Sequence, residues 1–346
     1  AQLVPIEGEA GRLRGVDSGE EVEWVEAPFV VGLIPGSSTL PSGADEDRVI
    51  TRFGLNLLGG RTGRLDGTVL GLGINWYTDR ADGAMAAIGA NLVEGDARAA
   101  QIAVAFNHAE GRIDGLQMAV GFNASGAGGS AVQSATGANV AGGSLVGGQI
   151  ATGLNWTSGR LSGVQAAVGV NLVAGQADEE SGGADEVVMD GVQLAAGTNW
   201  AHGAIDGVQA TAGVNVAGGG DSSGAQIAAG VNVAGGTIEG AQIAAGVNTA
   251  GRIEGAQIGV INVGGSADGL QLGVINVAVG EVDGAQIGVL NYADAVDAPI
   301  GVLSIVRRGR FRAALWADEV NAGNLGAKLG SEHVYTLLTV GAAGRS

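Results

Sequence analysis

Apolar and polar residues alternate along short segments that recur through most of the chain. In residues 242–248, Gln242, Ala244 and Asn248 share one side, while Ile243 and Ala245 lie on the other. A period of two residues is that of a β-strand with two different faces. The repeats contain no sustained apolar stripe of helical period, so the pattern predicts an all-β protein with few helices.

An asparagine marks each repeat. From Asn91 to Asn171 successive asparagines are sixteen residues apart, and a glutamine stands six residues before most of them. A unit this short is one rung or one strand, never a domain. The predicted asparagine ladder is Asn91, Asn107, Asn123, Asn139, Asn155, Asn171, Asn199, Asn215, Asn232 and Asn248. The predicted glutamine ladder is Gln101, Gln117, Gln133, Gln149, Gln165, Gln193, Gln209, Gln226 and Gln242.

The unit favours a parallel β-solenoid of about 15 short rungs, each of 14–16 residues, with non-repeat caps. In such a fold identical residues stack about 4.8 Å apart, and their side-chain amides hydrogen-bond along the axis. A second, shorter apolar element is expected after each asparagine, carried by Ile205, Ile238, Ile253 and Val282. We place the asparagines near rung corners, because Asn tolerates left-handed backbone better than most residues.

An outer-membrane antiparallel β-barrel is the alternative. Its natural period would be a two-strand hairpin of about 32 residues, yet odd and even units do not alternate. The Gln-to-Asn spacing also shrinks from six to five residues after Gln257, Gln271 and Gln286. A rung can absorb such a loss at a corner more easily than a membrane-spanning strand can, so the sequence favours the solenoid.

The repeats occupy residues 51–297 and are flanked by two regions without them. Residues 1–50 contain four of the five prolines and are predicted to form a lead-in or cap. Residues 298–346 contain alternating segments near 311–316 and 334–340, which predict an antiparallel β cap. The acidic insertion at 178–186 is expected to be a solvated loop.

Composition narrows the function classes. The net charge of -18 offers no basic footprint, so nucleic acid is not an expected partner. The chain has no cysteine, which excludes disulfides, thiolate metal sites and a catalytic thiol. No run of eighteen apolar residues predicts a membrane-spanning helix. The Ala-Gln start is typical of what signal-peptide removal leaves, and it predicts export.

Tandem Gly-x-Gln-Ile-Gly-Val-Ile/Leu-Asn units stand at 255–262 and 284–291, followed by Ala-Pro-Ile-Gly-Val-Leu-Ser-Ile-Val at 298–306. With these motifs the chain resembles bacterial surface-repeat proteins over about residues 50–340. The resemblance implies an exported protein of the cell envelope, at the outer-membrane surface or outside the cell, and it implies no catalytic residues. Val69 and Met85 depart from the pattern at glutamine positions.

Candidate chemical sites are few. His108, His202 and His333 do not stand in a triad-like arrangement, and no cofactor, metal site or small-molecule substrate is predicted. The acids that precede each Gly-x-Gln should stack into a column. We favour a solvated charged edge over calcium sites, because the Gly-Gly-x-Gly-x-Asp signature is missing. The predicted column is Asp66, Asp82, Asp114, Asp190, Asp206, Glu239, Glu254, Asp268 and Asp283.

Four aromatic residues follow the asparagines of their units directly: Trp76, Trp156, Trp200 and Tyr292. If the rungs stack in register, these side chains share one edge of the body, which makes them a candidate interaction edge. The competing interpretation is that they fill gaps at the rung corner.

These features predict a non-enzymatic, exported structural or adhesive cell-surface protein that presents a regular β face and self-assembles. The expected partners are other envelope proteins or further copies of the chain, with the membrane surface as a further candidate. The alternative function is that of an outer-membrane β-barrel or a membrane-seated, pore-like β-sheet protein.

Overall fold

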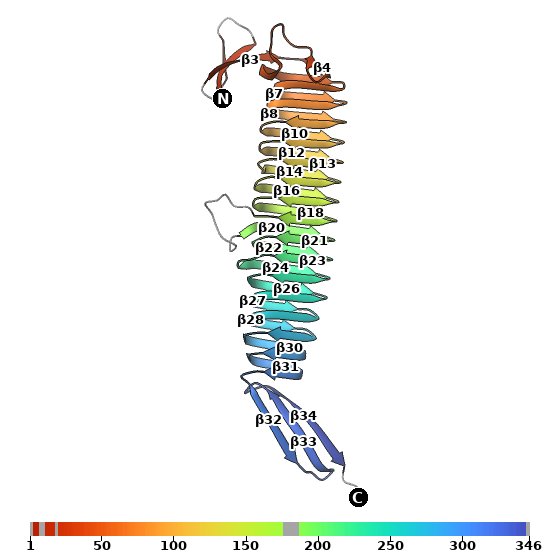
Figure 1. Cartoon of the computed structure of the whole chain (residues 1–346), viewed down its shortest axis with the longest axis vertical. Helices are drawn as coiled ribbons and strands as arrows, with labels where there is room; N and C mark the ends of the chain where they lie inside the picture. Colours follow the sequence, from red (N-terminus) through yellow and green to blue (C-terminus); the bar gives the residue numbers. More distant parts are fainter. Residues whose placement is uncertain (1–2, 7–10, 18–19, 176–186, 344–346) are drawn as a thin grey trace. The chain divides into compact units, whose positions relative to one another are not determined.

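The computed structural model describes residues 3–6, 11–17, 20–175 and 187–343. The chain divides into two compact units, Ala1–Asp178 and Glu179–Ser346 (Figure 1). Among the described residues the only helix is the short 3-10 helix η1 (Glu46–Arg48), and nearly all other ordered structure is β-strand. The predicted all-β class is therefore confirmed, while the acidic insertion at 178–186 lies outside the described residues.

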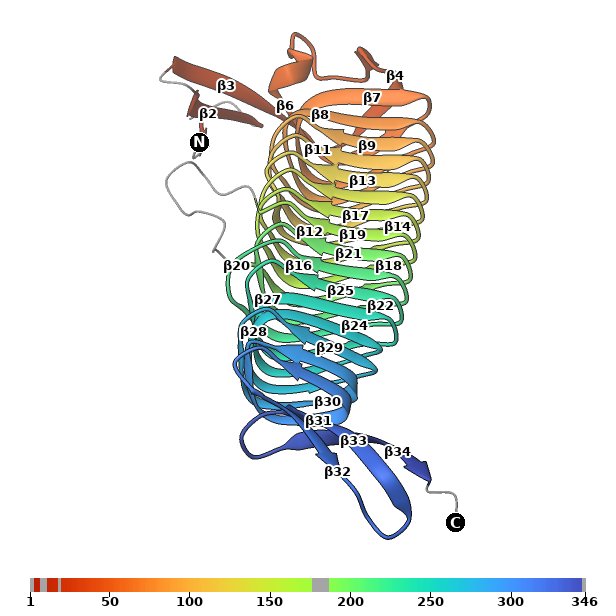
Figure 2. The ribbon, with the colours of Figure 1, turned by 60° about the horizontal axis from the view of Figure 1, so that its bottom comes forward.

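Each coil of the first unit combines a long strand that carries the glutamine position with a short strand that carries the asparagine position. The stack begins with β6 (Val49–Asn56), β7 (Gly59–Gly71) and β8 (Ile74–Ala87). Its later long strands are β10 (Ala97–Ala103), β12 (Ile113–Ala119), β14 (Gly129–Ala135), β16 (Leu145–Ala151) and β18 (Leu161–Ala167). Its short strands are β9 (Ala90–Val93), β11 (Phe106–Ala109), β13 (Phe122–Ser125), β15 (Ala138–Ala141), β17 (Leu154–Thr157) and β19 (Val170–Val173) (Figure 2).

The second unit repeats the same coil. Its long strands are β20 (Val187–Ala195), β22 (Ala204–Thr211), β24 (Ser222–Ala228) and β26 (Thr237–Ala244). Its short strands are β21 (Thr198–Ala201), β23 (Val214–Ala217), β25 (Val231–Ala234) and β29 (Ile275–Ala278). Strands that combine both positions are β27 (Val247–Ile258), β28 (Ile261–Leu272), β30 (Glu281–Ala293) and β31 (Ala295–Val306).

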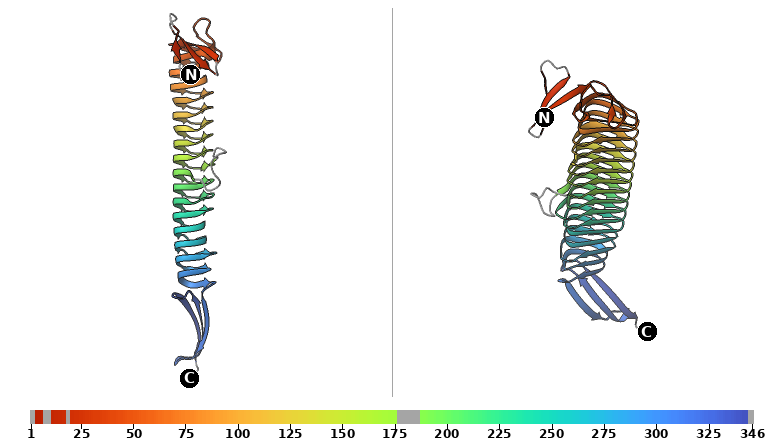
Figure 3. Two further views of the ribbon diagram at one scale, coloured as in Figure 1. Left: turned by 90° about the vertical axis from the view of Figure 1, so that its left-hand side faces the viewer. Right: turned by 45° about the horizontal axis from the view of Figure 1, so that its top comes forward.

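Neighbouring coils pair in parallel and in register. Gln101 lies opposite Gln117 in the first unit, and Gln226 lies opposite Gln242 in the second. Short strands pair in the same way, with Asn107 opposite Asn123. Within each unit the coils lie one on the next in both views of Figure 3. The predicted parallel β-solenoid of about 15 rungs is confirmed, and the antiparallel barrel alternative is wrong.

The corner of the coil falls between the glutamine and the asparagine. In one coil the long strand ends at Ala119, Val120 and Gly121 form the bend, and the short strand begins at Phe122. Asn123 therefore lies inside a strand, so the expected corner position of the asparagines is wrong. The expected separate element at Ile205 is also wrong, because Ile205 is the second residue of β22.

The amide side chains of both ladders lie inside the coil. Gln117 Nε2 donates to Oε1 of Gln101 at 2.7 Å, and Asn107 Nδ2 donates to Oδ1 of Asn123 at 2.9 Å. All predicted ladder residues have no exposed surface. A buried polar group without a partner costs about 1–3 kcal/mol, so mutual hydrogen bonding is what makes this polar interior tolerable. The predicted ladders are confirmed.

The two ladders donate in opposite directions along the chain. Within each unit, glutamine Nε2 atoms donate to the preceding coil, whereas asparagine Nδ2 atoms donate to the following coil. The amides also cross the interior: Gln117 Nε2 reaches the carbonyl of Ala124 at 3.2 Å, and Asn107 Nδ2 reaches that of Met118 at 2.8 Å. Each ladder thus ties coil to coil and long strand to short strand.

Apolar side chains complete the interior beside the ladders. The first inward residue of the long strand is buried in coil after coil, as at Ile113, Leu145 and Leu161. Val69 and Met85, which depart from the pattern, occupy the glutamine position and are buried there. Gln101 Nε2 contacts the Met85 sulfur at 3.7 Å. These substitutions therefore preserve the register of the stack.

A glycine two residues before most of the glutamines bends the long strand, whereas Ala99 and Ala131 stand at this position before Gln101 and Gln133. Gly147 has a φ of +131°, and a Cβ there would lie 2.2 Å from the carbonyl oxygen of Ala131 in the preceding coil. A residue with a side chain would be strained in this conformation and would collide with that oxygen. The close approach of successive coils thus explains the glycine of the Gly-x-Gln motif.

Parallel pairing extends beyond both predicted boundaries of the repeat region. The N-terminal strands are β1 (Val4–Pro5), β2 (Arg12–Asp17), β3 (Glu20–Ala27), β4 (Val30–Ile34) and β5 (Ser37–Ser38). Val30 of β4 lies opposite Gly54 of β6 in parallel. At the other end, Pro299 and Ser304 of β31 lie opposite Gln286 and Asn291. The boundaries predicted at residues 50 and 297 are therefore too narrow.

A three-stranded antiparallel sheet follows the last coil of the second unit, formed by β32 (Arg310–Trp316), β33 (Asn321–Gly330) and β34 (Tyr335–Ala343). Ser331 Oγ donates to the carbonyl of Asp297 at 3.0 Å, and Thr336 Oγ1 donates to that of Gly301 at 2.8 Å. The antiparallel strands predicted near 311–316 and 334–340 are confirmed.

Candidate interaction surface

The outer side of the long strands is apolar. Because side chains alternate along a strand, an inward glutamine forces its neighbours outward. In β10, Gln101 has no exposed surface, whereas Ile102 is 48% exposed. The solenoid therefore keeps its amides inside and displays aliphatic side chains to the surroundings.

Two mainly aliphatic rows, interrupted by Ser134, Thr136 and Thr152, run along the outside of the first unit, the first on the long strands and the second mostly on the bends that follow them. The first row holds the residue after each glutamine position: Val31, Leu55, Leu70, Ala86, Ile102, Met118, Ser134, Ile150 and Ala166. The second row holds the third residue after that position: Leu33, Leu57, Leu72, Ile88, Val104, Val120, Thr136, Thr152 and Val168. Neither row contains a charged residue.

The second unit carries the same two rows, and the side chains of its second row are smaller than those of the first unit. Its first row is Leu194, Ala210, Ile227, Ile243, Ile258, Leu272, Ile287 and Ile300. Its second row is Ala196, Ala212, Ala229, Ala245, Val260, Val274, Val289 and Val302. Alanine occupies the first half of the second row and valine the second half, so the side chains of this row are larger toward β31.

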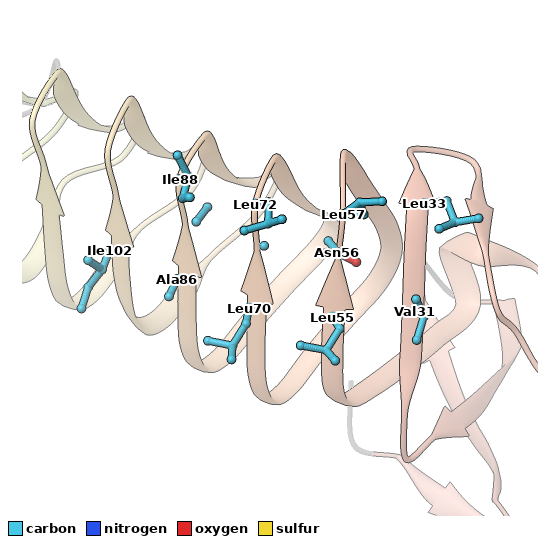
Figure 4. A pocket seen from close by; sticks show the side chains of 12 residues that line it. Val31, Leu33, Leu55, Asn56, Leu57, Leu70, Leu72, Ala86, Ile88 and Ile102 are labelled. Carbon is cyan, nitrogen blue, oxygen red and sulfur yellow. The ribbon is translucent and has the colours of Figure 1, made fainter.

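A groove of about 610 Å³ lies between the two rows at the first coils of the first unit. Figure 4 shows Leu55 and Leu70 on one side of it and Leu57 and Leu72 on the other. Gly71 contributes to the lining between the rows. The lining is aliphatic except for Asn56, so the groove can take apolar groups but offers no charge to hold an ionic ligand.

Acidic side chains lie along one edge of the coil. In the second unit, Glu239, Glu254, Asp268 and Asp283 face one another in successive coils. In the first unit the column is interrupted, since Arg98 lies opposite Asp82. Arg252 Nε pairs with Glu254 Oε1 at 2.9 Å. The predicted column therefore exists along one edge of each unit but is broken in both, by Arg98 in the first and by Ser223 between Asp206 and Glu239 in the second.

The four predicted aromatic residues do not come together. Trp76 and Trp156 occupy the same outward position of the first unit, with Leu92, His108, Ala124 and Val140 in the coils between them.

Trp200 and Tyr292 occupy that position in the second unit, also separated by several coils. Trp76 donates from Nε1 to Glu94 Oε1 at 2.8 Å, whereas Trp156 and Trp200 are exposed. The aromatic side chains thus share a row within each unit without forming a cluster.

Side chains that could hold a metal ion are not clustered in the described part of the chain. There, no three His, Asp or Glu side chains gather in a way that could bind a metal ion. The described residues also include no helix with the length and apolar composition needed to cross a bilayer.

A comparison of the chain with protein-family models, with curated proteins and with solved structures found no match in any of the three. Function is therefore inferred from the geometry of the coil itself.

The ladders and the aromatic positions were predicted from the sequence, whereas the location of the aliphatic rows on the outer surface was not. The sequence did contain a signal for the aliphatic rows. In water, a hydrogen bond between two amides contributes little net stability, so a ladder of hydrogen-bonded amides is expected in the interior of the coil. The alternation along the strand then places Ile243 on the outer surface.

Proposed function

We propose that this chain is a non-enzymatic structural repeat protein of the bacterial cell envelope that acts by docking its outer apolar face. The observation that carries the proposal is the pair of aliphatic rows outside a coil whose interior is held by amides. Monomeric soluble proteins rarely expose contiguous apolar patches of more than a few hundred Å², and larger patches mark interaction surfaces.

The inward and outward sides of the strand carry different kinds of side chain, and this difference supports a docking role. The ladders hold the coil together through hydrogen bonds such as that of Gln133 Nε2 to Gln117 Oε1 at 2.7 Å. The aliphatic side chains are therefore free to gain their burial from a partner. A surface with uncharged, mostly aliphatic residues at the same positions of every coil suits an extended contact rather than a localised reaction.

Export and an envelope location rest on the resemblance to bacterial surface-repeat proteins. We test them by expressing the protein in a bacterium from the complete reading frame that encodes it. Cell fractionation should recover it with the envelope. Recovery in the cytoplasmic fraction alone would refute this part of the proposal.

Docking through the outer face is tested with a charge pair in the second aliphatic row. The double variant Val104→Glu with Val120→Glu should be retained by the envelope several-fold less than the unmodified chain. Its matched control is Ala124→Glu with Val140→Glu, which adds the same charge on the outer side of the short strands. Equal retention of both variants would show that the aliphatic rows do not dock.

A further inference from the structure

Side chains on the outer face of the first unit repeat at a regular spacing, and only a surface with the same spacing can pack against them along the whole unit. Along each aliphatic row the side chains recur once per coil, at about 4.8 Å, and the second row stands about 7 Å from the first, on the bends that follow the long strands. A third outward row, before the glutamine position, contains Leu116, Val132 and Val164. Between the rows lie grooves of the same period.

We propose that a second copy of this chain covers this face, sheet against sheet, with the rows of each copy in the grooves of the other. The inference rests on the proposed docking function and specifies the partner. A second copy has rows and grooves of identical spacing, so it is complementary to the face along its whole length. A partner without a parallel β repeat would match only a few coils.

The size of the face is sufficient for a stable contact. Nine coils make the first row about 40 Å long, and three outward rows make the face about 13 Å wide. Two such faces together bury roughly 1,000 Å², which is the lower limit for specific interfaces between proteins. The rows contain no charge that burial would leave without a partner.

The position of the acids selects the relative direction of the two copies. In the first unit Asp66, Asp82 and Asp114 lie on one side of the face, with Arg98 between the last two. In the second unit Glu239, Glu254, Asp268 and Asp283 hold the same position in successive coils. The bends that carry the second row, such as Val120–Gly121, contain no charge. A two-fold axis parallel to the coil axis places the acidic edges of the copies on opposite sides. Antiparallel copies would bring them to the same side, where like charges repel. The two copies therefore run parallel.

This acidic edge also argues against an anionic membrane as the occupant. The chain carries a net charge of -18, and an anionic lipid surface would repel it. A neutral bilayer lacks that repulsion but has no 4.8 Å period. Vesicles of phosphatidylcholine are therefore the probe that separates the two occupants.

Self-association is measured by sedimentation of the full chain. We expect a dimer that strengthens with added sodium chloride, because salt screens the repulsion between the acidic copies. Val104→Glu with Val120→Glu should raise the dimer dissociation constant at least about tenfold, whereas Ala124→Glu with Val140→Glu should leave it unchanged. Circular dichroism shows whether each variant is folded.

The direction is measured with single cysteines, which the chain allows because it has none of its own. Leu70→Cys, Ile102→Cys and Ile150→Cys place one thiol in the first row at three heights, and Ala124→Cys is the control on the other side. Parallel copies should crosslink at all three heights and not at the control. Crosslinking at only one height would overturn the parallel arrangement.

A chain that sediments as a monomer, or binds phosphatidylcholine vesicles through the same face as a monomer, would overturn the inference. Loss of envelope retention in the Val104→Glu with Val120→Glu variant would still support the docking function in that case. The two proposals can therefore fail separately.

Discussion

Regular and shortened coils differ in length but not in the geometry of their ladders. From Asn91 to Asn171 each coil has sixteen residues, whereas the steps from Asn248 to Asn262 and on to Asn276 have fourteen. The Asn-to-Asn hydrogen bonds measure 2.8–2.9 Å in the regular coils and 2.9 Å in the shortened ones. The ladder is therefore fixed while the length of the coil varies.

The shortened coils lose contacts at the corner next to the ladder. In the regular coils an inward alanine, such as Ala244, lies two residues after the glutamine. In the shortened coils Gly259 stands there, and a Cβ on it would lie 2.7 Å from Asn248 Nδ2. Asn262 also makes fewer hydrogen bonds than Asn123. The comparison teaches that a corner can lose a residue provided that the amides keep their register.

The largest effect should follow from removing one amide of a regular coil. Asn123 donates to the carbonyls of Gln117 and Ser134 and to Asn139, at 3.2, 2.8 and 2.9 Å. Asn123→Leu leaves these acceptors without that donor, so we expect a loss of about 3–5 kcal/mol in the free energy of unfolding, measured by urea denaturation.

The matching substitution in a shortened coil should cost less. Asn262 donates only to the carbonyl of Leu272 and to Asn276, both at 2.9 Å. We expect Asn262→Leu to lose about 1 kcal/mol less than Asn123→Leu, because one hydrogen bond fewer is broken. Ala124→Leu, on the outer side, is the control. Equal losses in both coils would mean that the third hydrogen bond contributes nothing.

A smaller effect is expected at the bend of the long strand. Gly147→Ala places a Cβ against the carbonyl of Ala131 at a φ of +131°, and should lower stability by about 1–3 kcal/mol. Ala131 occupies the same register position one coil earlier. Ala131→Gly is therefore the reverse control, for which less than about 1 kcal/mol is expected. A stable Gly147→Ala variant would show that the coils can move apart.

The end of the glutamine ladder offers a stabilising change. Gln286 Oε1 is buried without a hydrogen-bond partner, since Pro299 lies opposite it. Pro299→Gln would supply an Nε2 donor at that position and extend the ladder by one coil. We expect a gain of about 1 kcal/mol in the unfolding free energy. An unchanged or lower stability would show that β31 cannot accept a glutamine in the coil interior.

The smallest effect concerns pH. Arg307, together with Arg308, lowers the pKa of the Asp294 carboxyl below its ordinary value. Its stabilising contribution is therefore present above pH of about 4 and is lost as the pH falls through the lowered pKa. The melting temperature of the unmodified chain should exceed that of Asp294→Asn at pH 6, and the difference should vanish in stronger acid. A difference that does not change with pH would contradict this assignment.

The sequence predicted the register of the coils because identical amides recur at positions that a strand places on one side. Gln117 over Gln101 follows directly from that spacing. The parallel direction also followed, because odd and even units are alike. The lost residue after Gln257 was correctly attributed to a corner.

Other features could not be predicted from the repeat. The first and last coils pair with their neighbours through backbone hydrogen bonds. In the last coil, Pro299 and Ser304 occupy the positions of the glutamine and the asparagine, so the amide repeat did not reveal that coil. The corner was predicted at the asparagine rather than at the bend between Gln117 and Asn123, because the two-residue alternation continues across that bend. The aromatic row was predicted from position alone, which does not show that other residues separate Trp76 from Trp156.

The opposed donation of the two ladders has an electrostatic consequence. A column of amides that all point the same way adds its dipoles from end to end, as the peptide groups of a helix do. Here the positive ends of the asparagine amides point forward along the chain and those of the glutamine amides point backward, so the two columns cancel. Coils can therefore be added or removed without building up charge at either end of a stack.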